Sequence, residues 1–397
     1  MGKLKEHEKI VGSSVIDKIK KEAEPLKGTS LLQVNSTKIG GGVAEILETM
    51  IPLFNELKIR TQWKVIKGDK PFFETTKNLH NAIQGKGHEV SERECKHYLA
   101  MNRRFVETEN LNQDCVIIHD PQPCASITFA KKKQPWIWRC HIDLSRPKLK
   151  VWNFLKPFIS MYDTMVVSNS SYKRKDIRVP QKIIMPSINP LNTKNAPMNE
   201  TAMNRILKKY DIDPDKPIIT QVSRFDKWKD PMGVIEVFKK IKKSVDCKLV
   251  LLGSAATDDP EGMEIYKKII EHPSKDIIVI SHEDDNLVNA LQTISHVVIQ
   301  KSIKEGFGLT VTEALWKGTP VIGGNVGGIK SQIIDGKNGY LVDTFDYNFC
   351  AKRAIKILSD EKLRDKMGKY GHEYVKKNFL TTRHLLDWIK TIRFVMK

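Results

Sequence analysis

The chain has 397 residues, of which 40% are hydrophobic and 28% charged, as in an ordinary globular protein. This length exceeds what one hydrophobic core usually supports, so we expect two domains. No run approaches the roughly 18–20 apolar residues of a membrane span, and the N-terminus lacks the core of a signal peptide, which makes the cytoplasm the expected location. The six cysteines include no Cys-x-x-Cys pair, so neither a zinc site nor a disulfide framework is predicted.

The formal net charge of +19 raises the question of an anionic partner. A surface for nucleic acid or for an anionic membrane is one explanation. The lysines, however, are spread along the whole chain among Glu and Asp, and the sequence contains no aromatic-rich RNA-binding motif. We therefore interpret the charge as solvated faces that also favour phosphate-bearing substrates. We expect neither a membrane nor a nucleic acid as partner.

The first half of the chain alternates strand and helix, as in a doubly wound domain. Residues 1–27 are charged and predict an outlying helix, and a helix at about 43–57 follows the first strand and a glycine loop. The polar stretch 186–199, with three prolines and four asparagines, predicts an interdomain linker. Strands are predicted at 31–35, 63–66, 115–119, 136–140, 165–168 and 183–185.

The loop after the first strand is Asn35-Ser-Thr-Lys-Ile-Gly-Gly-Gly-Val-Ala-Glu45. Glycine lets a backbone approach a phosphate or a sugar closely, and the helix N-terminus behind it favours negative charge. Gly41 and Gly42 are therefore candidate ligand contacts. The pattern is not Gly-x-Gly-x-x-Gly, which argues against a nicotinamide site. A plain flexible turn is the alternative.

Two further segments leave predicted strands of the first half. His119-Asp-Pro-Gln-Pro123 is a loop stiffened by two prolines, and its Asp120 and Gln122 are natural partners for sugar hydroxyls. An Asp-Pro turn without a ligand is the alternative. Trp136-Ile-Trp-Arg-Cys-His-Ile-Asp143 combines an aromatic strand with His141, although a lone histidine is more often structural.

The second half repeats the strand and helix alternation. From residue 346 onward the chain is expected to be helical and charged. Strands are predicted near 218–223, 248–252, 277–281, 296–300 and 320–323.

The segment Gln221-Val-Ser-Arg-Phe-Asp-Lys-Trp-Lys-Asp230 follows the first strand of the second half. Arg224 and Lys229 therefore leave the carboxyl end of a strand, where ligands of open parallel sheets gather. Both are expected on an exposed loop. A guanidinium fork and a lysine point charge five positions apart are suited to gripping a diphosphate.

Residues 305–313 read Glu-Gly-Phe-Gly-Leu-Thr-Val-Thr-Glu and follow an apolar strand. Glu305 is expected on the loop beyond that strand, and Glu313 on the short helix after it. The free backbone N–H groups at the helix start favour an anion. A carboxylate beside such a cradle suits a sugar nucleotide, whereas a charged loop before a surface helix is the alternative. The candidate contacts at the helix start are Gly306, Phe307, Gly308, Leu309 and Thr310.

Together these two segments resemble the donor site of retaining glycosyltransferases of family 4. That family carries an Arg and a Lys after the first strand of its second domain and a Glu-x7-Glu motif further on, which match Arg224/Lys229 and Glu305/Glu313. The first-domain motifs narrow the resemblance, over about residues 31–379, to the trehalose glycosyltransferring synthases and the related retaining trehalose phosphorylases. One departure is Asp230-Pro231 after Lys229, where related enzymes often have Gly, and it is expected to alter the start of the next helix without removing Lys229.

The resemblance implies the GT-B fold, an α/β architecture of two Rossmann-like doubly wound domains that face each other across a cleft. The expected acceptor domain is 1–190, and the nucleotide-sugar donor domain is 191–379. In this fold the last helix commonly crosses back, so a C-terminal crossover helix at about 380–397 is assigned to the first domain.

The implied activity is a retaining hexosyltransferase that makes α,α-trehalose from an NDP-glucose and glucose, reversibly. Arg224, Lys229 and the N–H groups at 308–310 would hold the diphosphate, with Glu313 near the ribose. Glu305 and His141 would hold the transferred glucose. Acceptor glucose would lie near Gly41, Gly42, Asp120 and Gln122. No cofactor and no metal is expected, because the two cations offset the charge on the leaving NDP.

Two alternatives stay open. The nearer is a retaining trehalose phosphorylase, which converts trehalose and phosphate to glucose 1-phosphate and glucose, with phosphate in the place of an NDP phosphate. The distant one is a basic nucleic-acid-binding protein on a Rossmann-like scaffold, which predicts steeply salt-dependent binding. The sequence does not identify the nucleotide base, the physiological direction or the oligomeric state, a homodimer included.

Overall fold

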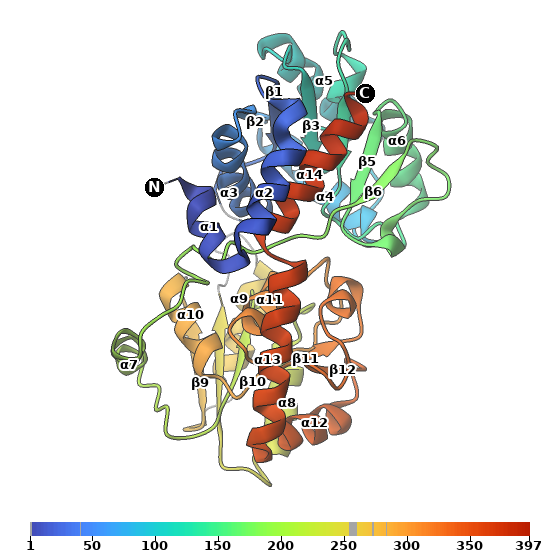
Figure 1. The fold of residues 1–397 in the computed structure, drawn as a ribbon. Coiled ribbons are helices and arrows are strands. Elements are labelled where there is room, and N and C mark those ends of the chain that lie inside the picture. Colours follow the sequence, from blue (N-terminus) through green and yellow to red (C-terminus); the bar gives the residue numbers. More distant parts are fainter. Residues whose placement is uncertain (1, 40, 254–259, 272–273, 283) are drawn as a thin grey trace. The chain divides into compact units, whose positions relative to one another are not determined.

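The computed structural model describes residues 2–39, 41–253, 260–271, 274–282 and 284–397 (Figure 1). The chain divides into two compact units. Unit 1 comprises Met1–Ser187 and Thr381–Lys397, and unit 2 comprises Ile188–Leu380. These divisions lie beside the boundaries predicted from the sequence. Each unit has one six-stranded parallel sheet, which agrees with the predicted α/β architecture of two doubly wound domains.

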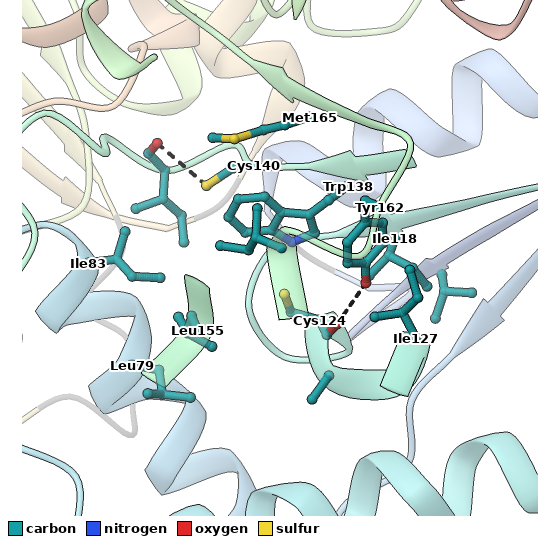
Figure 2. Close-up of a cluster of buried hydrophobic side chains, with 14 of the residues drawn as sticks. Leu79, Ile83, Ile118, Cys124, Ile127, Trp138, Cys140, Leu155, Tyr162 and Met165 are labelled. Carbon is teal, nitrogen blue, oxygen red and sulfur yellow. Dashed lines mark hydrogen bonds between the residues drawn. The ribbon is translucent and has the colours of Figure 1, made fainter. Parts of the chain in front are cut away.

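The sheet of unit 1 has the strand order β2-β1-β3-β4-β5-β6. Its central strands are short apolar runs buried on both faces, as parallel strands covered by helices are. Val116 and Ile118 enter one core, and Ile117 between them enters the other. Figure 2 shows part of the first core, around Trp138 and Tyr162. The strands are β1 (Ser30–Asn35), β2 (Arg60–Val65), β3 (Cys115–His119), β4 (Trp136–Arg139), β5 (Thr164–Val167) and β6 (Gln181–Ile183).

Among the described residues, unit 1 has seven α-helices. A capping box in the sequence defines the start of α5. The Ser91 hydroxyl accepts the Glu94 backbone N–H, and the Glu94 carboxylate accepts the Ser91 backbone N–H. The helices are α1 (Lys3–Val11), α2 (Ser13–Ala23), α3 (Gly42–Glu56), α4 (Lys70–Ile83), α5 (Glu92–Thr108), α6 (Leu149–Ile159) and α14 (Thr381–Val395).

The N-terminal segment is not the outlying helix that the sequence predicted. It forms two helices, and α2 lies beside α14 from the far end of the chain (Figure 1). Ile16 and Ile19 of α2 share a buried core with Trp388 and Ile389 of α14. The helical spacing of these apolar residues buries one face, while the lysines that suggested an outlying segment lie on the other.

The sheet of unit 2 has the order β12-β11-β10-β7-β8-β9. Its strands are β7 (Ile218–Val222), β8 (Lys248–Gly253), β9 (Ile277–Ser281), β10 (Val297–Gln300), β11 (Val321–Gly324) and β12 (Gly339–Val342). Its helices are α7 (Glu200–Lys209), α8 (Pro231–Ile241), α9 (Pro260–Ile270), α10 (Asp285–Ile294), α11 (Leu309–Trp316), α12 (Tyr347–Ser359) and α13 (Glu361–Asn378). β12, a four-residue strand that begins with glycine, was not predicted from the sequence.

The chain passes between the units at two neighbouring points. Ile188 forms a parallel bridge with Leu380 and donates its N–H to the carbonyl of Phe379 at 2.9 Å. The segment that follows, expected as a linker, is irregular up to α7 but packed on unit 2, where the Asn195 carbonyl accepts the indole N–H of Trp316 at 3.0 Å. The last helix, α14, belongs to unit 1.

Candidate active site

In unit 2, both candidate segments leave the carboxyl ends of neighbouring strands. β10 and β7 pair in parallel, with Val298 opposite Thr220, so the loops after them emerge at one edge of the sheet. The loop after β7 carries Arg224 and Lys229, and the loop after β10 carries Glu305. The structure thus brings the loops that carry the two motifs to the same edge of the sheet.

Lys229 and Glu305 form an ion pair between these loops. Their side chains are only 16% and 12% exposed, so the predicted exposed position is wrong for Lys229. It holds for Arg224, which is 64% exposed and donates to Asp226 at 2.9 Å. The Asp226 carboxylate also accepts the backbone N–H groups of Trp228 and Lys229, and this fixes the shape of the loop.

A second ion pair joins the same two loops, but here the loop after β10 supplies the lysine and the loop after β7 supplies the carboxylate. The fully buried Lys301 donates to Asp230 and to the carbonyl of Thr344, the latter at 3.0 Å. Asp230 has φ +49°, in the left-handed region that favours glycine. Its side chain also caps α8 by accepting the Gly233 N–H. Asp230 therefore combines a left-handed backbone conformation with a side chain that caps α8 and pairs with Lys301.

The turn between Glu305 and α11 depends on glycine at two points. Gly308 has φ +83°, and a Cβ on Gly328 would lie 2.5 Å from the Cα of Phe307. The buried Gln332 donates to the Phe307 carbonyl at 2.6 Å and accepts the Thr312 hydroxyl at 2.5 Å. The N-terminus of α11 is therefore held in place by its surroundings, as a preorganised anion site requires.

Glu313 lies within the buried part of α11 and is only 4% exposed, which excludes the surface-helix alternative. Its carboxylate accepts a long hydrogen bond of 3.4 Å from Gln292. Lys317 donates to Gln292 and to Asn195 at 3.0 and 3.1 Å. Burial lowers the pKa of Lys317 to about 8, and attraction to Glu313 partly opposes that shift. Glu313 thus belongs to a polar cluster inside unit 2, and its predicted contact with ribose stays a prediction.

In unit 1, the glycine turn lies between β1 and α3. Gly41 has φ +83° and precedes the first residue of α3, Gly42. The Asn35 side chain donates to the Thr37 carbonyl at 2.6 Å and accepts the indole N–H of Trp63 at 2.8 Å, which anchors the start of the turn. Gly40, the first glycine of the motif, lies outside the described residues. Both described glycines are exposed.

The loop after β3 is tied to the protein on several sides. The Tyr98 hydroxyl donates to the Pro121 carbonyl at 2.6 Å, and Trp138 donates to the carbonyl of Asp120 at 2.9 Å. Asp120 has φ +63°, and its carboxylate accepts the backbone N–H of His141 at 2.7 Å. Among the described residues, the side-chain oxygen of Gln122 is buried and lacks a hydrogen-bond partner, which suits a ligand or water contact there.

His141 is held by a second histidine that the sequence analysis did not single out. Nε2 of His141 lies 2.9 Å from Nδ1 of His119, and Nε2 of His119 lies 2.7 Å from Oε1 of Gln33. The two imidazole planes are inclined by 19° with centroids 5.2 Å apart, so the rings meet edge to edge through Nε2 of His141 and Nδ1 of His119. Asp120 and His141 are thus in direct contact, and His119 links His141 to Gln33.

The electrostatics of this edge disfavour additional charge. Burial and the nearby Arg139 lower the pKa of His119 to about 3 and hold the pKa of His141 well below its usual value. Burial raises the pKa of Asp120 to about 6, although the His141 N–H and Arg139 oppose the shift. Arg139 itself is fully buried and donates to Ser168 at 3.0 Å. The imidazoles at this edge are therefore neutral at physiological pH.

Within the described ranges, no group of three or more His, Cys, Asp or Glu side chains could hold a metal ion. No helix in the described part of the chain is long and apolar enough to cross a membrane.

Known proteins resemble the chain over nearly its whole length. Residues 33–174 match the family model for the trehalose synthase N-terminal domain, and residues 203–374 match the model for glycosyl transferases group 1. The chain is 44% identical to the trehalose synthase of Thermococcus litoralis over 392 residues, covering 96% of this chain and 95% of that protein. It is 26% identical to the trehalose phosphorylase of Grifola frondosa, covering 97% of this chain and 60% of that protein.

The fold is similar to that of an α,α-trehalose 6-phosphate synthase from Burkholderia multivorans. The TM-score is 0.71 at 14% identity, and the match covers 93% of this chain and 98% of that one. At this identity the likeness concerns the fold alone. Together with the two six-stranded parallel sheets, it confirms the predicted GT-B fold class.

Proposed function

The chain belongs to the trehalose synthase family of the group 1 glycosyl transferases, and from that premise we propose that it transfers glucose from an NDP-glucose to a second glucose to form α,α-trehalose. The transfer is reversible and retains the α configuration. Family membership confirms the predicted class of enzyme, a glycosyltransferase. The choice of donor and acceptor is our proposal.

The observation that carries the proposal is the contact between Lys229 and Glu305 beside the N-terminus of α11. A diphosphate oxygen on Lys229 and a sugar hydroxyl on Glu305 would be close neighbours. They are close neighbours in a sugar nucleotide too, on either side of the anomeric bond. The exposed guanidinium of Arg224 and the N–H groups at 308–310 would bind the remaining phosphate oxygens.

The same groups supply the chemistry of a retaining transfer without a covalent intermediate. Negative charge builds on the leaving phosphate as the anomeric bond breaks, and preorganised cations and N–H groups stabilise it. The acceptor hydroxyl attacks from the face that the phosphate leaves, and the departing phosphate oxygen takes its proton. Glu305 and His141 orient the transferred glucose, and Glu313 serves the ribose.

We assign the acceptor glucose to unit 1. Gly41 and Gly42 present exposed backbone, and the unpartnered oxygen of Gln122 supports a hydrogen bond from a hydroxyl. Asp120 donates or accepts according to its protonation, since its pKa lies at about 6.

Phosphorolysis of trehalose is a second candidate, because a trehalose phosphorylase matches 97% of this chain. Inorganic phosphate would then occupy the position of the NDP phosphate on Arg224 and Lys229. Glu313 favours the nucleotide, because a contact with ribose has no use in a phosphorylase.

Product analysis separates the two candidates. The purified protein is incubated with glucose and ADP-, UDP- or GDP-glucose, and in parallel with trehalose and phosphate. We expect α,α-trehalose and NDP from at least one donor, identified by chromatography and by the anomeric signals in the NMR spectrum. Glucose 1-phosphate formed from trehalose and phosphate, with no product from any NDP-glucose, would establish the phosphorylase instead.

A further inference from the structure

Three side chains of unit 1 form a hydrogen-bonded chain that ends at His141. Gln33 lies on β1, His119 ends β3, and His141 follows β4. Because β3 lies between β1 and β4 in the sheet, the three side chains meet at its carboxyl edge. The contacts are 2.7 Å from Gln33 Oε1 to His119 Nε2 and 2.9 Å from His119 Nδ1 to His141 Nε2.

The donor and acceptor groups of these three side chains fix the direction in which the hydrogen bonds run. Gln33 presents its carbonyl oxygen, which only accepts, so Nε2 of His119 carries a proton. A neutral imidazole has one N–H, so Nδ1 of His119 is an acceptor. Nε2 of His141 must then donate, and Nδ1 of His141 keeps its lone pair. Burial and Arg139 lower the pKa of both histidines, which keeps both rings neutral.

We propose that Gln33 and His119 are positioning residues that fix the tautomer of His141, so that its Nδ1 accepts a hydrogen bond from a hydroxyl of the sugar. The proposal rests on the function proposed above, in which His141 contacts the transferred glucose. It assigns to Gln33 and His119 a role in that function that acts only through His141.

The direction of the chain matters for the kind of ligand that His141 can select. An imidazolium, or the opposite tautomer, would present an N–H at Nδ1 and would prefer an acceptor such as a phosphate oxygen. A neutral ring with a free lone pair at Nδ1 instead prefers a hydroxyl donor. The backbone of His141 is held separately by Asp120, so the ring and the main chain have independent supports.

The tautomer can be measured directly on the intact protein. In protein labelled with 15N-histidine, protonated and unprotonated ring nitrogens have well-separated shifts, and the signals of His141 are assigned by comparison with H141N. We expect a protonated Nε2 and an unprotonated Nδ1 at neutral pH. The reverse pattern, or two protonated nitrogens, would overturn the proposal. This measurement needs no substrate, so its outcome does not depend on the reaction that the enzyme catalyses.

Two substitutions of His119 separate a role in hydrogen bonding from a role in packing. H119N keeps an acceptor near the position of Nδ1, whereas H119F keeps an aromatic ring of similar size without one. We expect H119N to keep kcat within about threefold and H119F to lower it by about tenfold or more, with little change in the KM for the donor. A purely structural role predicts the opposite order, because Phe fills the buried space better than Asn.

The matched control is H7F, since His7 is another buried histidine of unit 1, on α1. We expect H7F to leave kcat unchanged. Q33M should act in the direction of H119F, because it removes the carbonyl that orients His119. Equal kcat values for H119N and H119F, both close to the wild-type value, would overturn the proposal while leaving the glycosyltransferase activity intact.

Discussion

The candidate site residues of the two units differ in charge. In unit 2 the edge of the sheet carries ionic side chains, with Lys229 paired to Glu305 and Lys301 paired to Asp230. In unit 1 the corresponding edge carries two neutral imidazoles, because burial and Arg139 keep His119 and His141 uncharged, beside the Asp120 carboxyl, whose pKa is raised to about 6. Both sheets are parallel and six-stranded, so the contrast comes from the residues at the strand ends and in the loops and not from the architecture.

This difference in charge indicates which kind of ligand each unit is suited to bind. A diphosphate needs fixed positive charge, and a site that holds its cations in place does not have to reorganise when charge develops. A glucose acceptor is uncharged and has many hydroxyls, so it is better matched by neutral groups that accept and donate in pairs. In the proposed reaction the same fold would thus serve a charged donor and a neutral acceptor.

The largest effect should come from breaking the buried pair in unit 2. Replacing Lys301 by Met leaves the Asp230 carboxylate without its partner, and we expect the free energy of unfolding to fall by about 3–5 kcal/mol. Urea unfolding measures this directly. K239M is the control, because Lys239 forms a pair with Glu236 that is nearly half exposed on both sides. If the two variants were equally stable, the pair would have no structural role.

Catalysis should be most sensitive to the charges on the diphosphate side. We expect Arg224→Ala or Lys229→Ala to lower kcat/KM by on the order of 10²–10³, the scale for losing one preorganised donor. Lys227→Met is the control on the same loop, because Lys227 is exposed. Near-normal activity in either alanine variant would show that this residue does not bind the diphosphate, and the proposed difference between the units would lose its support.

Much of the fold was accessible from the sequence, because buried parallel strands are continuous apolar runs. The runs at 115–119 and 277–281 match β3 and β9 residue for residue. The strand Gly339–Val342 escaped because four residues that begin with glycine carry no pattern of their own. The packing of α2 on α14 escaped because the partner lies at the other end of the chain, and a charged composition hides a one-sided apolar face.

Some site residues could likewise be predicted from the sequence, and others could not. Arg224, Lys229 and Glu305 were predicted to share a site from their motifs, and two of them are in contact in the structure. Lys301 was missed because it directly follows an apolar strand, and its partner lies 71 residues away. Gln33 was missed because one polar residue within a strand has many explanations. The chain Gln33–His119–His141 exists only once three strands are placed side by side.

The two carboxylates of the Glu-x7-Glu motif, Glu305 and Glu313, should differ in which kinetic constant they control. Glu305→Gln should chiefly lower kcat, because its hydrogen bonds strengthen as the sugar ring gains positive charge. Glu313→Ala should chiefly weaken donor binding, by roughly 1–3 kcal/mol for a lost charged hydrogen bond. Varying the donor concentration gives kcat and KM for both variants. A collapse of kcat at position 313 with an unchanged kcat at 305 would mean that the roles are reversed.

A smaller effect should appear in unit 1 as a dependence of stability on pH. The native pKa of Asp120 is raised to about 6, so its contribution to stability is complete below the unfolded pKa and is lost as the pH rises through about 6. The free energy of unfolding of Asp120→Asn, relative to that of the wild type, should therefore rise between pH 4 and pH 7. The expected gain is roughly 1–2 kcal/mol, since one pKa unit corresponds to roughly 1.4 kcal/mol and water screens part of the effect.

Unfolding of both proteins at the two pH values tests this expectation. The buried histidines also titrate in acid, but they are common to both proteins and cancel in the difference. A difference that does not change with pH would show that Asp120 is an ordinary carboxylate, whose ionisation its buried surroundings in unit 1 do not disfavour.

The smallest expected effect is that of removing divalent metal. A metal ion in a glycosyltransferase would neutralise the leaving diphosphate, and in this protein we assign that task to Arg224, Lys229 and the N-terminus of α11. Activity in excess EDTA should therefore equal activity in added Mg²⁺ or Mn²⁺, measured with the same donor and glucose. The alanine variant of Lys229 sharpens the test, because a metal-dependent enzyme would keep its main positive charge in that variant. Loss of wild-type activity in EDTA, with recovery in Mg²⁺, would show that the side chains of unit 2 do not suffice for the diphosphate.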